Sequence, residues 1–272
     1  MNPSRQGPFH NRAALILGGT SGIGLAAFEL LKSQGCRCVA IGKPELNHSI
    51  SNCNDIIYAD VTTPAAFAIA FDIALKKLGG TIDILIHTIG GSARSSGDGP
   101  LAQCTLEGFQ AAIRLNLETA FLALQAGVRQ MQSQSPDMHG QRGCLALVGS
   151  VLATNPSVSH FNTIGYSAAK AALEALVRTS AAAYAANGIR INMLKPGLVA
   201  TPMAERALAN PDILEFLIHK QPLTHGPLSP QACAQALLGL VHPDAVGLTG
   251  SVLTLDGGWS ISDGHNPMSG LN

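Results

Sequence analysis

Tyr166 and Lys170 lie four residues apart in GYSAAKAALEALV (165–177), a stretch otherwise rich in alanine and leucine. Those residues favour a helix, and a spacing of four places the phenol and the ammonium on one helix face. A phenol beside a cation can give up or accept a proton. The same spacing also occurs on surface helices. On such a helix Lys170 would pair with Glu174, and Tyr166 would pack at the edge of a core. Other motifs of the chain are needed to distinguish a catalytic pair from a surface helix.

Proton transfer at neutral pH requires a lowered tyrosine pKa. A forming alkoxide needs a proton, and the removal of a proton from an alcohol needs a base. Lowering a tyrosine pKa from about 10 to about 7 requires roughly 4 kcal/mol. A positive charge about 4 Å away supplies roughly that amount at an effective dielectric constant near 20. The sequence therefore predicts that Lys170 lowers the pKa of Tyr166.

The composition favours one large domain with a substantial core. The chain has 272 residues, 46% of them hydrophobic, and its 17 basic residues balance 17 acidic ones, so we expect neither nucleic acid nor a membrane as partner. No apolar run approaches the roughly 20 residues that cross a bilayer, and residues 1–12 lack the apolar core of a signal peptide, which predicts a cytoplasmic protein. The six cysteines form no CxxC pair, so no metal site is expected.

Short apolar runs alternate with helical stretches, the pattern of repeated βαβ units. Seven runs are expected to be strands: 13–19, 37–42, 55–60, 82–90, 144–150, 189–197 and 250–258. Helices are expected at 23–34, 64–78, 105–132, 165–187 and 230–241. The predicted fold class is therefore α/β, a single-domain, Rossmann-like, doubly wound parallel sheet of about seven strands with helices on both faces and ligands at the carboxyl ends of the strands.

No repeat or linker divides the chain. Residues 1–11 are expected to form a flexible N-terminal segment, residues 12–260 a dinucleotide-binding catalytic domain, and residues 261–272 a C-terminal tail. Residues 201–230 are irregular in pattern and are expected to form a lid. The apolar residues of this lid segment fit either an apolar substrate pocket or the packing of an amphipathic lid helix onto its own domain.

GGTSGIG (18–24) directly follows the first predicted strand and opens a helix. Glycines at this position let the backbone turn sharply and approach a pyrophosphate, which the free amides of the helix N-terminus then bind. Any tight turn between a strand and a helix also uses glycine. The place of the loop after the first strand favours the dinucleotide interpretation.

The spacing GxxxGxG resembles that of the short-chain dehydrogenase/reductase family, and so does the YxxxK spacing of Tyr166 and Lys170. The resemblance extends over nearly the whole chain. Other motifs of the family follow in its usual order: YADVT (58–62), the asparagine of IRLNLETAF (113–121), the serine that ends LALVGS (145–150), KPGLVAT (195–201) and LTGSVLTLDGG (248–258).

The resemblance implies an NAD(P)-dependent oxidoreductase that transfers a hydride between nicotinamide and a carbonyl or alcohol. Tyr166 would be the general acid and base, Lys170 would hold the cofactor ribose, Ser150 would orient the substrate oxygen, and Asn116 would position a water-linked proton path. The cofactor-binding residues that it implies are Gly18, Thr20, Ser21, Gly22, Ile23, Gly24, Lys43, Asp60, Val61, Gly90, Tyr166, Lys170, Pro196, Gly197, Val199 and Thr201. The family also implies a homo-oligomer, most often a tetramer.

The chain departs from the family pattern in three places. Leu17 replaces a threonine before the first glycine, and HTIG (87–90) stands where NNAG is common. His87 is expected to be structural rather than catalytic. The interval between Ser150 and Tyr166 is longer than usual, and this insertion is expected to shape the substrate pocket. Ser157 and Ser159 lie within it and are alternatives to Ser150, although neither ends a strand.

Two other functions fit parts of the pattern. A redox sensor could bind the dinucleotide without turnover, but such a protein would be expected to lack the tyrosine or the lysine. An enoyl reductase is the second alternative, because IHTIG (86–90) faintly resembles enoyl-thioester reductases. Those enzymes place the lysine seven positions after the tyrosine rather than four, which argues against this alternative.

The end of the second predicted strand indicates the cofactor. NAD-dependent enzymes commonly place an acidic residue there, which binds the ribose 2′-hydroxyl. CVAIGKPEL (38–46) has Gly42 at that position and Lys43 next to it, which leaves room and a positive charge for a 2′-phosphate. The sequence therefore predicts NADP(H) over NAD(H), with NAD(H) also possible if Glu45 takes the acidic role. Ser21 stands where many NADP-dependent relatives have a second basic residue.

Overall fold

Seven parallel strands form the centre of the structure, a computed structural model that describes residues 7–44 and 54–265. Their order in the sheet is β3-β2-β1-β4-β5-β6-β7. The strands are β1 (Ala13–Leu17), β2 (Arg37–Gly42), β3 (Ile56–Tyr58), β4 (Ile84–His87), β5 (Gly143–Val148), β6 (Ile189–Pro196) and β7 (Val252–Leu255). Because the strand order reverses between β1 and β4, the sheet is doubly wound as predicted, and a crevice opens at the carboxyl ends of these two strands.

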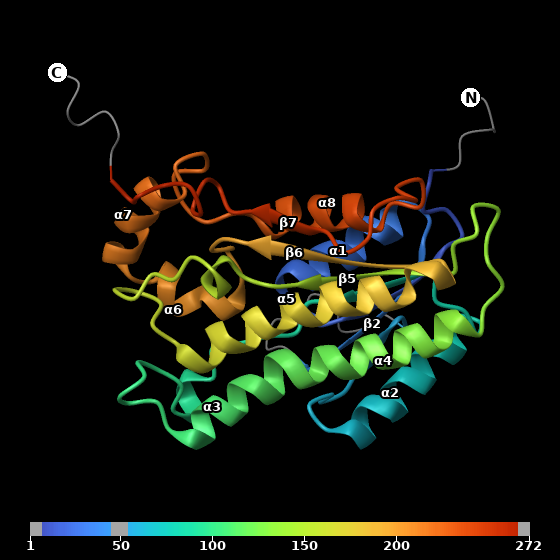
Figure 1. Cartoon of the computed structure of the whole chain (residues 1–272), viewed down its shortest axis with the longest axis horizontal. Coiled ribbons are helices and arrows are strands. Elements are labelled where there is room, and N and C mark those ends of the chain that lie inside the picture. Colours follow the sequence, from blue (N-terminus) through green and yellow to red (C-terminus); the bar gives the residue numbers. More distant parts are fainter. Residues whose placement is uncertain (1–6, 45–53, 266–272) are drawn as a thin grey trace.

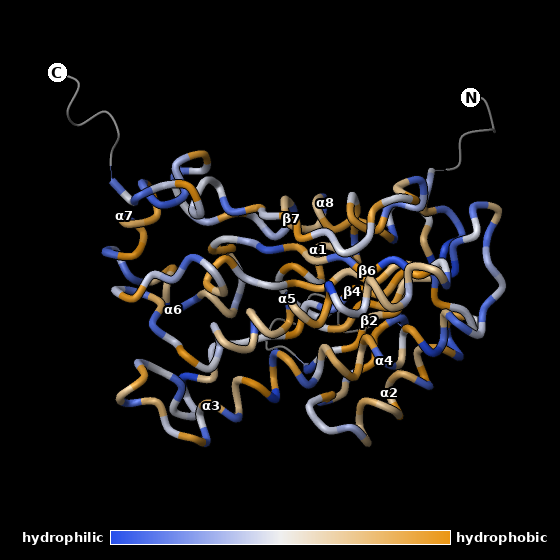
Figure 2. Tube along the Cα trace, viewed as in Figure 1, coloured by the Kyte–Doolittle hydropathy of each residue, from blue (hydrophilic) through white to orange (hydrophobic). Residues whose placement is uncertain are grey.

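Helices cover both faces of this sheet (Figure 1). One face carries α2 (Pro64–Lys77), α4 (Thr119–Gln132) and α5 (Ile164–Tyr184), and the other carries α1 (Gly22–Ser33) and α8 (Pro230–Val241). Figure 2 shows the apolar strands at the centre and the polar residues on the outer turns. The strands are almost wholly apolar because both of their faces are buried.

Local sequence sets the start of three helices. Thr63, Thr105 and Ser229 precede α2, α3 (Leu106–Ile113) and α8, and each side chain accepts a hydrogen bond from an amide of the first helical turn. A proline follows Thr63 and Ser229 as the first helical residue, where its missing N–H leaves no bond unmade. These caps fix where the crossover helices begin.

The structure corrects three predicted boundaries. The helix expected at 105–132 is interrupted after α3 by a π-helical turn, Arg114–Glu118, before α4 begins. The strand expected at 82–90 ends at His87, because its partner β1 ends at Leu17, where the glycine loop starts. The strand expected at 250–258 spans only Val252–Leu255, since Gly257 and Gly258 both have positive φ and leave the extended conformation.

The N-terminal residues that the structure describes are packed, although residues 1–11 were predicted to be flexible. Phe9 is 2% exposed, and its ring lies 5.5 Å from that of His242, edge to face. An aromatic side chain buried in this way fixes the turn that precedes β1. The segment from Gly7 onward therefore belongs to the folded domain.

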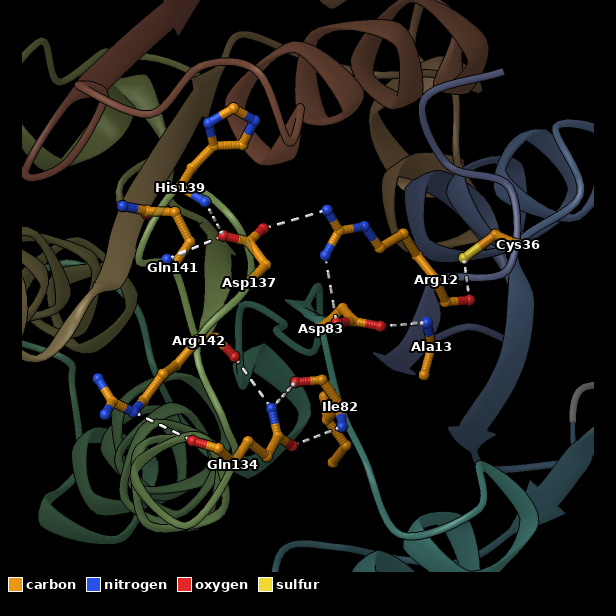
Figure 3. A network of polar contacts seen from close by, with 10 residues as sticks. All are labelled: Arg12, Ala13, Cys36, Ile82, Asp83, Gln134, Asp137, His139, Gln141 and Arg142. Carbon is orange, nitrogen blue, oxygen red and sulfur yellow. Dashed lines mark hydrogen bonds and ion pairs between the residues drawn. The ribbon is translucent and has the colours of Figure 1, made fainter. Parts of the chain in front are cut away.

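A polar network fastens the edge of the sheet where the strands begin (Figure 3). Arg12 lies between Asp83 and Asp137, with N–O distances of 3.4 and 3.2 Å, and Asp83 also accepts a hydrogen bond from the amide of Ala13 at 2.7 Å. Gln134 bonds both backbone groups of Ile82. These contacts join the starts of β1, β4 and β5 at the edge opposite the crevice.

A third apolar cluster lies apart from the two that cover the sheet. It is formed by the segment after β5, by α6 (Glu205–Leu208) and α7 (Pro211–Lys220), and by Trp259, which is 1% exposed. Its buried members are Val151, Ala207, Ile213, Leu217 and Trp259. No helix among the described residues is long and apolar enough to span a bilayer.

Candidate active site

A cavity of about 440 Å³ occupies the crevice at the carboxyl ends of the strands. Most of the residues predicted to bind cofactor or substrate line it: Gly18, Thr20, Ser21, Gly22, Ile23, Lys43, Asp60, Val61, Gly90, Ser150, Tyr166, Lys170, Pro196, Gly197, Val199 and Thr201. Two predicted residues, Gly24 and Asn116, do not line the cavity. Ser157 and Ser159 do not line it either, so Ser150 is the serine that stands beside Tyr166.

The glycine loop has the shape that a pyrophosphate requires. Gly18 and Gly22 have positive φ values of 86° and 51°. A Cβ atom on Gly24 would overlap with the carbonyl oxygen of Gly18, so only glycine allows α1 to start this close to β1. Ser21 precedes α1 without a side-chain cap, which leaves the first amides of the helix free for an anionic group.

Thr88, from the HTIG segment, supports this loop. Its hydroxyl donates to the carbonyl oxygens of Leu17 and Gly18, at 3.0 and 3.2 Å, and its amide donates to Leu17 at 2.8 Å. The side chain of Leu17 cannot form a hydrogen bond with the loop. Thr88, which directly follows the neighbouring strand β4, supplies these hydrogen bonds instead. The sequence comparison with NNAG did not anticipate this role.

Asn116 lies on the π-helical turn and is fully buried. Its amide nitrogen donates to the carbonyl oxygens of Gly91 and Ala112, both at 2.8 Å, and its oxygen accepts from the amide of Gly91 at 3.0 Å. These bonds hold the backbone at residue 91 beside the cavity. In this arrangement Asn116 positions the loop after β4, and its side chain does not face the cavity.

Gly90 lets this loop approach the lysine. A Cβ atom there would lie 2.7 Å from Asn116 Oδ1 and 3.0 Å from Lys170 Nζ, closer than ordinary contacts allow. The ammonium of Lys170 donates to the carbonyl oxygen of Val148, at the end of β5, at 2.9 Å. Lys170 is therefore fixed between the ends of β4 and β5 and does not pair with Glu174.

The electrostatics of Tyr166 differ from the prediction. Burial raises the pKa of Tyr166, and the hydrogen bond with Ser150 lowers it by less. Lys170 Nζ lies 5.8 Å from the centre of the tyrosine ring and is bonded to Val148, so the expected lowering of the tyrosine pKa by Lys170 is wrong for this arrangement. Burial also lowers the pKa of Lys170 to about 8. Desolvation is the largest cause of the shift in both groups.

Asp98 fixes the start of α5 and thereby the position of Tyr166. One carboxylate oxygen accepts from the amide of Gly165 and the other from the amide of Tyr166, both at 2.9 Å. An acidic side chain at a helix N-terminus is favoured by the helix dipole as well as by these bonds. Sequence reasoning missed this residue, because it lies in an irregular segment far from the helix that it caps.

Lys43 and Asp60 form an ion pair of 2.8 Å at the glycine-loop end of the cavity. The hydrogen bond from Lys43 is the main cause of a lowered pKa for Asp60. The sequence predicted open space beside Gly42, but the side chain of Thr20 fills it. A Cβ atom on Gly42 would overlap with the Thr20 hydroxyl. That hydroxyl donates a hydrogen bond to the carbonyl oxygen of Lys43 at 3.0 Å. Glu45 lies outside the described residues.

His87 is buried behind the site. The hydroxyl of Thr119 donates a hydrogen bond to the carbonyl oxygen of Leu115 at 2.7 Å. The same hydroxyl therefore accepts a hydrogen bond from His87 Nε2 at 3.1 Å. His87 Nδ1 has no hydrogen-bond partner among the described residues. Burial, together with the charge of Lys170, lowers the pKa of His87 to about 3. The imidazole is neutral and structural, as expected.

We predict that His87 makes the protein acid-sensitive. The unfolded chain binds a proton at His87 below about pH 6.5 and the folded protein only below about pH 3, so stability falls as pH decreases between these values. The loss between pH 7.5 and pH 5 is about 2 kcal/mol from this group. Urea unfolding at both pH values should show a smaller difference for His87→Asn than for the unchanged protein. Equal differences would contradict the prediction.

Comparisons with known proteins agree with this geometry. A family model described as enoyl-(acyl carrier protein) reductase matches residues 18–260. The chain is 28% identical to cis-4-hydroxycyclohexanecarboxylate dehydrogenase of Sinomonas cyclohexanicum, over 93% of this chain and 98% of that protein. It is 30% identical to 2,5-dichloro-2,5-cyclohexadiene-1,4-diol dehydrogenase of Sphingobium indicum, over 92% and 97% of the two chains.

A solved structure titled as a short chain dehydrogenase/reductase family protein superposes with a TM-score of 0.75 at 28% identity, covering 94% of this chain and 100% of the other. The relatives are named for the oxidation of alcohols, and the enoyl alternative is not favoured over that activity. The chain is accordingly an NAD(P)-dependent oxidoreductase that transfers a hydride between nicotinamide and a carbonyl or alcohol. It belongs to the short-chain dehydrogenase/reductase family.

Proposed function

We propose that the protein interconverts a secondary alcohol and a ketone with Tyr166 as the proton donor and acceptor. The observation that carries the proposal is that Tyr166, bonded to Ser150, faces the same cavity as the glycine loop. The bound dinucleotide supplies or accepts the hydride. Ser150 then binds the substrate oxygen, and Tyr166 gives that oxygen a proton or takes one from it.

In the direction of carbonyl reduction, Tyr166 is the proton donor. A tyrosine with a raised pKa keeps its proton and can donate it to the alkoxide as that charge forms. Lys170 is held by Val148 within the same cavity and would bind the ribose hydroxyls. Asn116 contributes by holding the backbone of Gly91. The glycine loop and the residues of 196–201 would bind the phosphates and the nicotinamide.

Relatives and cavity walls together support a ring-borne alcohol or ketone as substrate. Both curated relatives described above are named for alcohols on six-membered carbon rings. The cavity end beside Tyr166 is lined by Leu152, Phe161 and Trp259, and the rings of Phe161 and Trp259 lie 5.7 Å apart. Aromatic walls of this kind bind apolar rings.

Replacing Tyr166 by phenylalanine tests the proton-transfer role. Tyr166→Phe removes only the hydroxyl, so ketone reduction should fall about 10²-fold or more while cofactor affinity stays close to that of the unchanged protein. Steady-state rates on a cyclic ketone, a β-ketothioester and an enone, together with fluorescence titration of the cofactor, measure both effects. Retention of more than about a tenth of the rate would rule out Tyr166 as general acid.

We propose NADP(H) as the preferred cofactor, with Lys43 binding the 2′-phosphate. No acidic side chain stands at Gly42, and Lys43, whose side chain is 60% exposed, lines the cavity. Asp60 holds the ammonium there, and its negative charge also limits the preference. A single charge-assisted contact of this kind favours NADPH over NADH by about tenfold to a hundredfold.

Two substitutions test this cofactor preference in opposite directions. Lys43→Ala should remove most of the preference for NADPH, while Asp60→Asn leaves the ammonium unpaired and should increase it. Dissociation constants for NADPH and NADH, measured by fluorescence titration, provide the comparison. Tighter binding of NADH by the unchanged protein, or no loss of NADPH affinity in Lys43→Ala, would refute the assignment.

We also propose that the protein is a cytoplasmic homo-oligomer, a tetramer or at least a dimer. Helix α5 exposes small residues that permit close approach of a second helix: Ala168, Ala171, Ala172, Ala175, Ala182 and Ala183. Phe121 on α4 is exposed as well. The cysteines that the structure describes are free thiols, which suits a reducing compartment.

Light scattering tests the oligomeric state. It should give a mass of at least twice 28.1 kDa, and a monomer would contradict the proposal.

A further inference from the structure

Two arginines line the cavity at the end where Tyr166 lies. Arg94 belongs to the short helix Arg94–Ser96, between β4 and α3, and Arg206 belongs to α6 in the predicted lid segment. They are more than a hundred residues apart in the chain, and the fold brings both to one cavity. Neither belongs to a motif of the sequence.

Their neighbours place both arginines beside the proposed proton donor rather than beside the glycine loop. Arg94 lies within the electrostatic reach of Asp98. The carboxylate of Asp98 accepts a hydrogen bond from the amide of Tyr166. Arg206 donates to the carbonyl oxygen of His160 at 3.4 Å, in the segment that joins Ser150 to α5. The two guanidinium groups therefore stand over the substrate end of the cavity.

The positive charge of this pair is not neutralised by the protein. No ion pair joins either arginine to a carboxylate within residues 7–44 and 54–265. The nearby Asp98 is already bonded to the amides of Gly165 and Tyr166 and to the thiol of Cys104. Burial, followed by the charge of Arg206, lowers the pKa of Arg94, so Arg94 is partly desolvated and within electrostatic reach of a second positive charge.

Two further observations point to a ligand there. The guanidinium of Arg94 makes no hydrogen bond with the described part of the chain, so its five N–H donors have no protein acceptor there. Ala93, directly before it, has a φ of 48°, a left-handed conformation that is strained for a non-glycine residue. Strained backbone of this kind is concentrated at ligand sites. A bidentate anion between the arginines would offset their repulsion.

We propose that the substrate carries a carboxylate that Arg94 and Arg206 bind, while its carbonyl or hydroxyl group faces Tyr166. This inference rests on the proposed function, since it concerns the substrate of the same site. Apolar side chains line the same cavity as the arginines and Tyr166, Leu152 and Phe161 among them. The substrate class is accordingly a keto acid or hydroxy acid with an apolar body that separates the two groups.

Matched acids and esters test the proposal. The probes are 4-oxocyclohexanecarboxylate and linear keto acids from 4-oxopentanoate to 7-oxooctanoate, each compared with its methyl ester. The unchanged protein should reduce at least one acid with a kcat/KM about tenfold to a hundredfold above that of its ester. Arg94→Gln and Arg206→Gln should each abolish most of that difference, through a raised KM for the acid. Arg129→Gln, an exposed substitution on α4 outside the cavity, is the control.

Binding measurements separate this proposal from other outcomes. Calorimetry with cyclohexanecarboxylate, which has no carbonyl to reduce, should show binding that both cavity variants lose and Arg129→Gln keeps. Equal rates on acids and esters, or carboxylate binding that survives in both variants, would overturn the proposal. Weaker NADPH binding in the variants would also overturn it, because the anion would then be a cofactor phosphate. Failure to reduce any ketone would refute the proposed function, whereas the calorimetry would still decide the role of the arginines.

Discussion

Hydrogen bonds from Thr88 to the backbone of Leu17 and Gly18 hold the carboxyl ends of β1 and β4 together at the point where the strand order of the sheet reverses. The glycine loop begins on one side of this junction. On the other side, Gly90 brings the loop after β4 against Asn116 and Lys170. The glycine-loop end and the Tyr166 end of the cavity are therefore both built outward from one pair of strands. A parallel sheet provides such a junction only where its winding changes direction.

Burial governs the pKa values of Tyr166 and Lys170 more than their charges do. Tyr166 and Lys170 are both enclosed, and desolvation favours the neutral form of each. The spacing of Tyr166 and Lys170 on one helix therefore did not determine the pKa of Tyr166. The ammonium of Lys170 instead donates a hydrogen bond to the backbone carbonyl of Val148, at the end of β5. The environment of the phenol depends on where the fold provides acceptors, and spacing in the sequence does not reveal that.

The sequence was informative wherever local chemistry decides the structure. Apolar runs marked the strands, and the glycine spacing identified the turn at Gly18–Gly24, because no other residue fits there. Contacts between distant segments could not be predicted. Asp98 caps α5 from a loop 67 residues earlier, and Thr20 fills the space beside Gly42. The π-helical turn at Arg114–Glu118 also escaped prediction, because its composition is that of an ordinary helix.

The third apolar cluster, which joins Val151, Ala207, Leu217 and Trp259, has a separate consequence for divergence of the protein. It packs the walls of the substrate end without sharing buried residues with the two clusters that cover the sheet. The network of Arg12, Asp83 and Asp137 fastens the sheet at its opposite edge. Substitutions in this small cluster would therefore reshape one end of the cavity without changing the buried residues that cover the sheet.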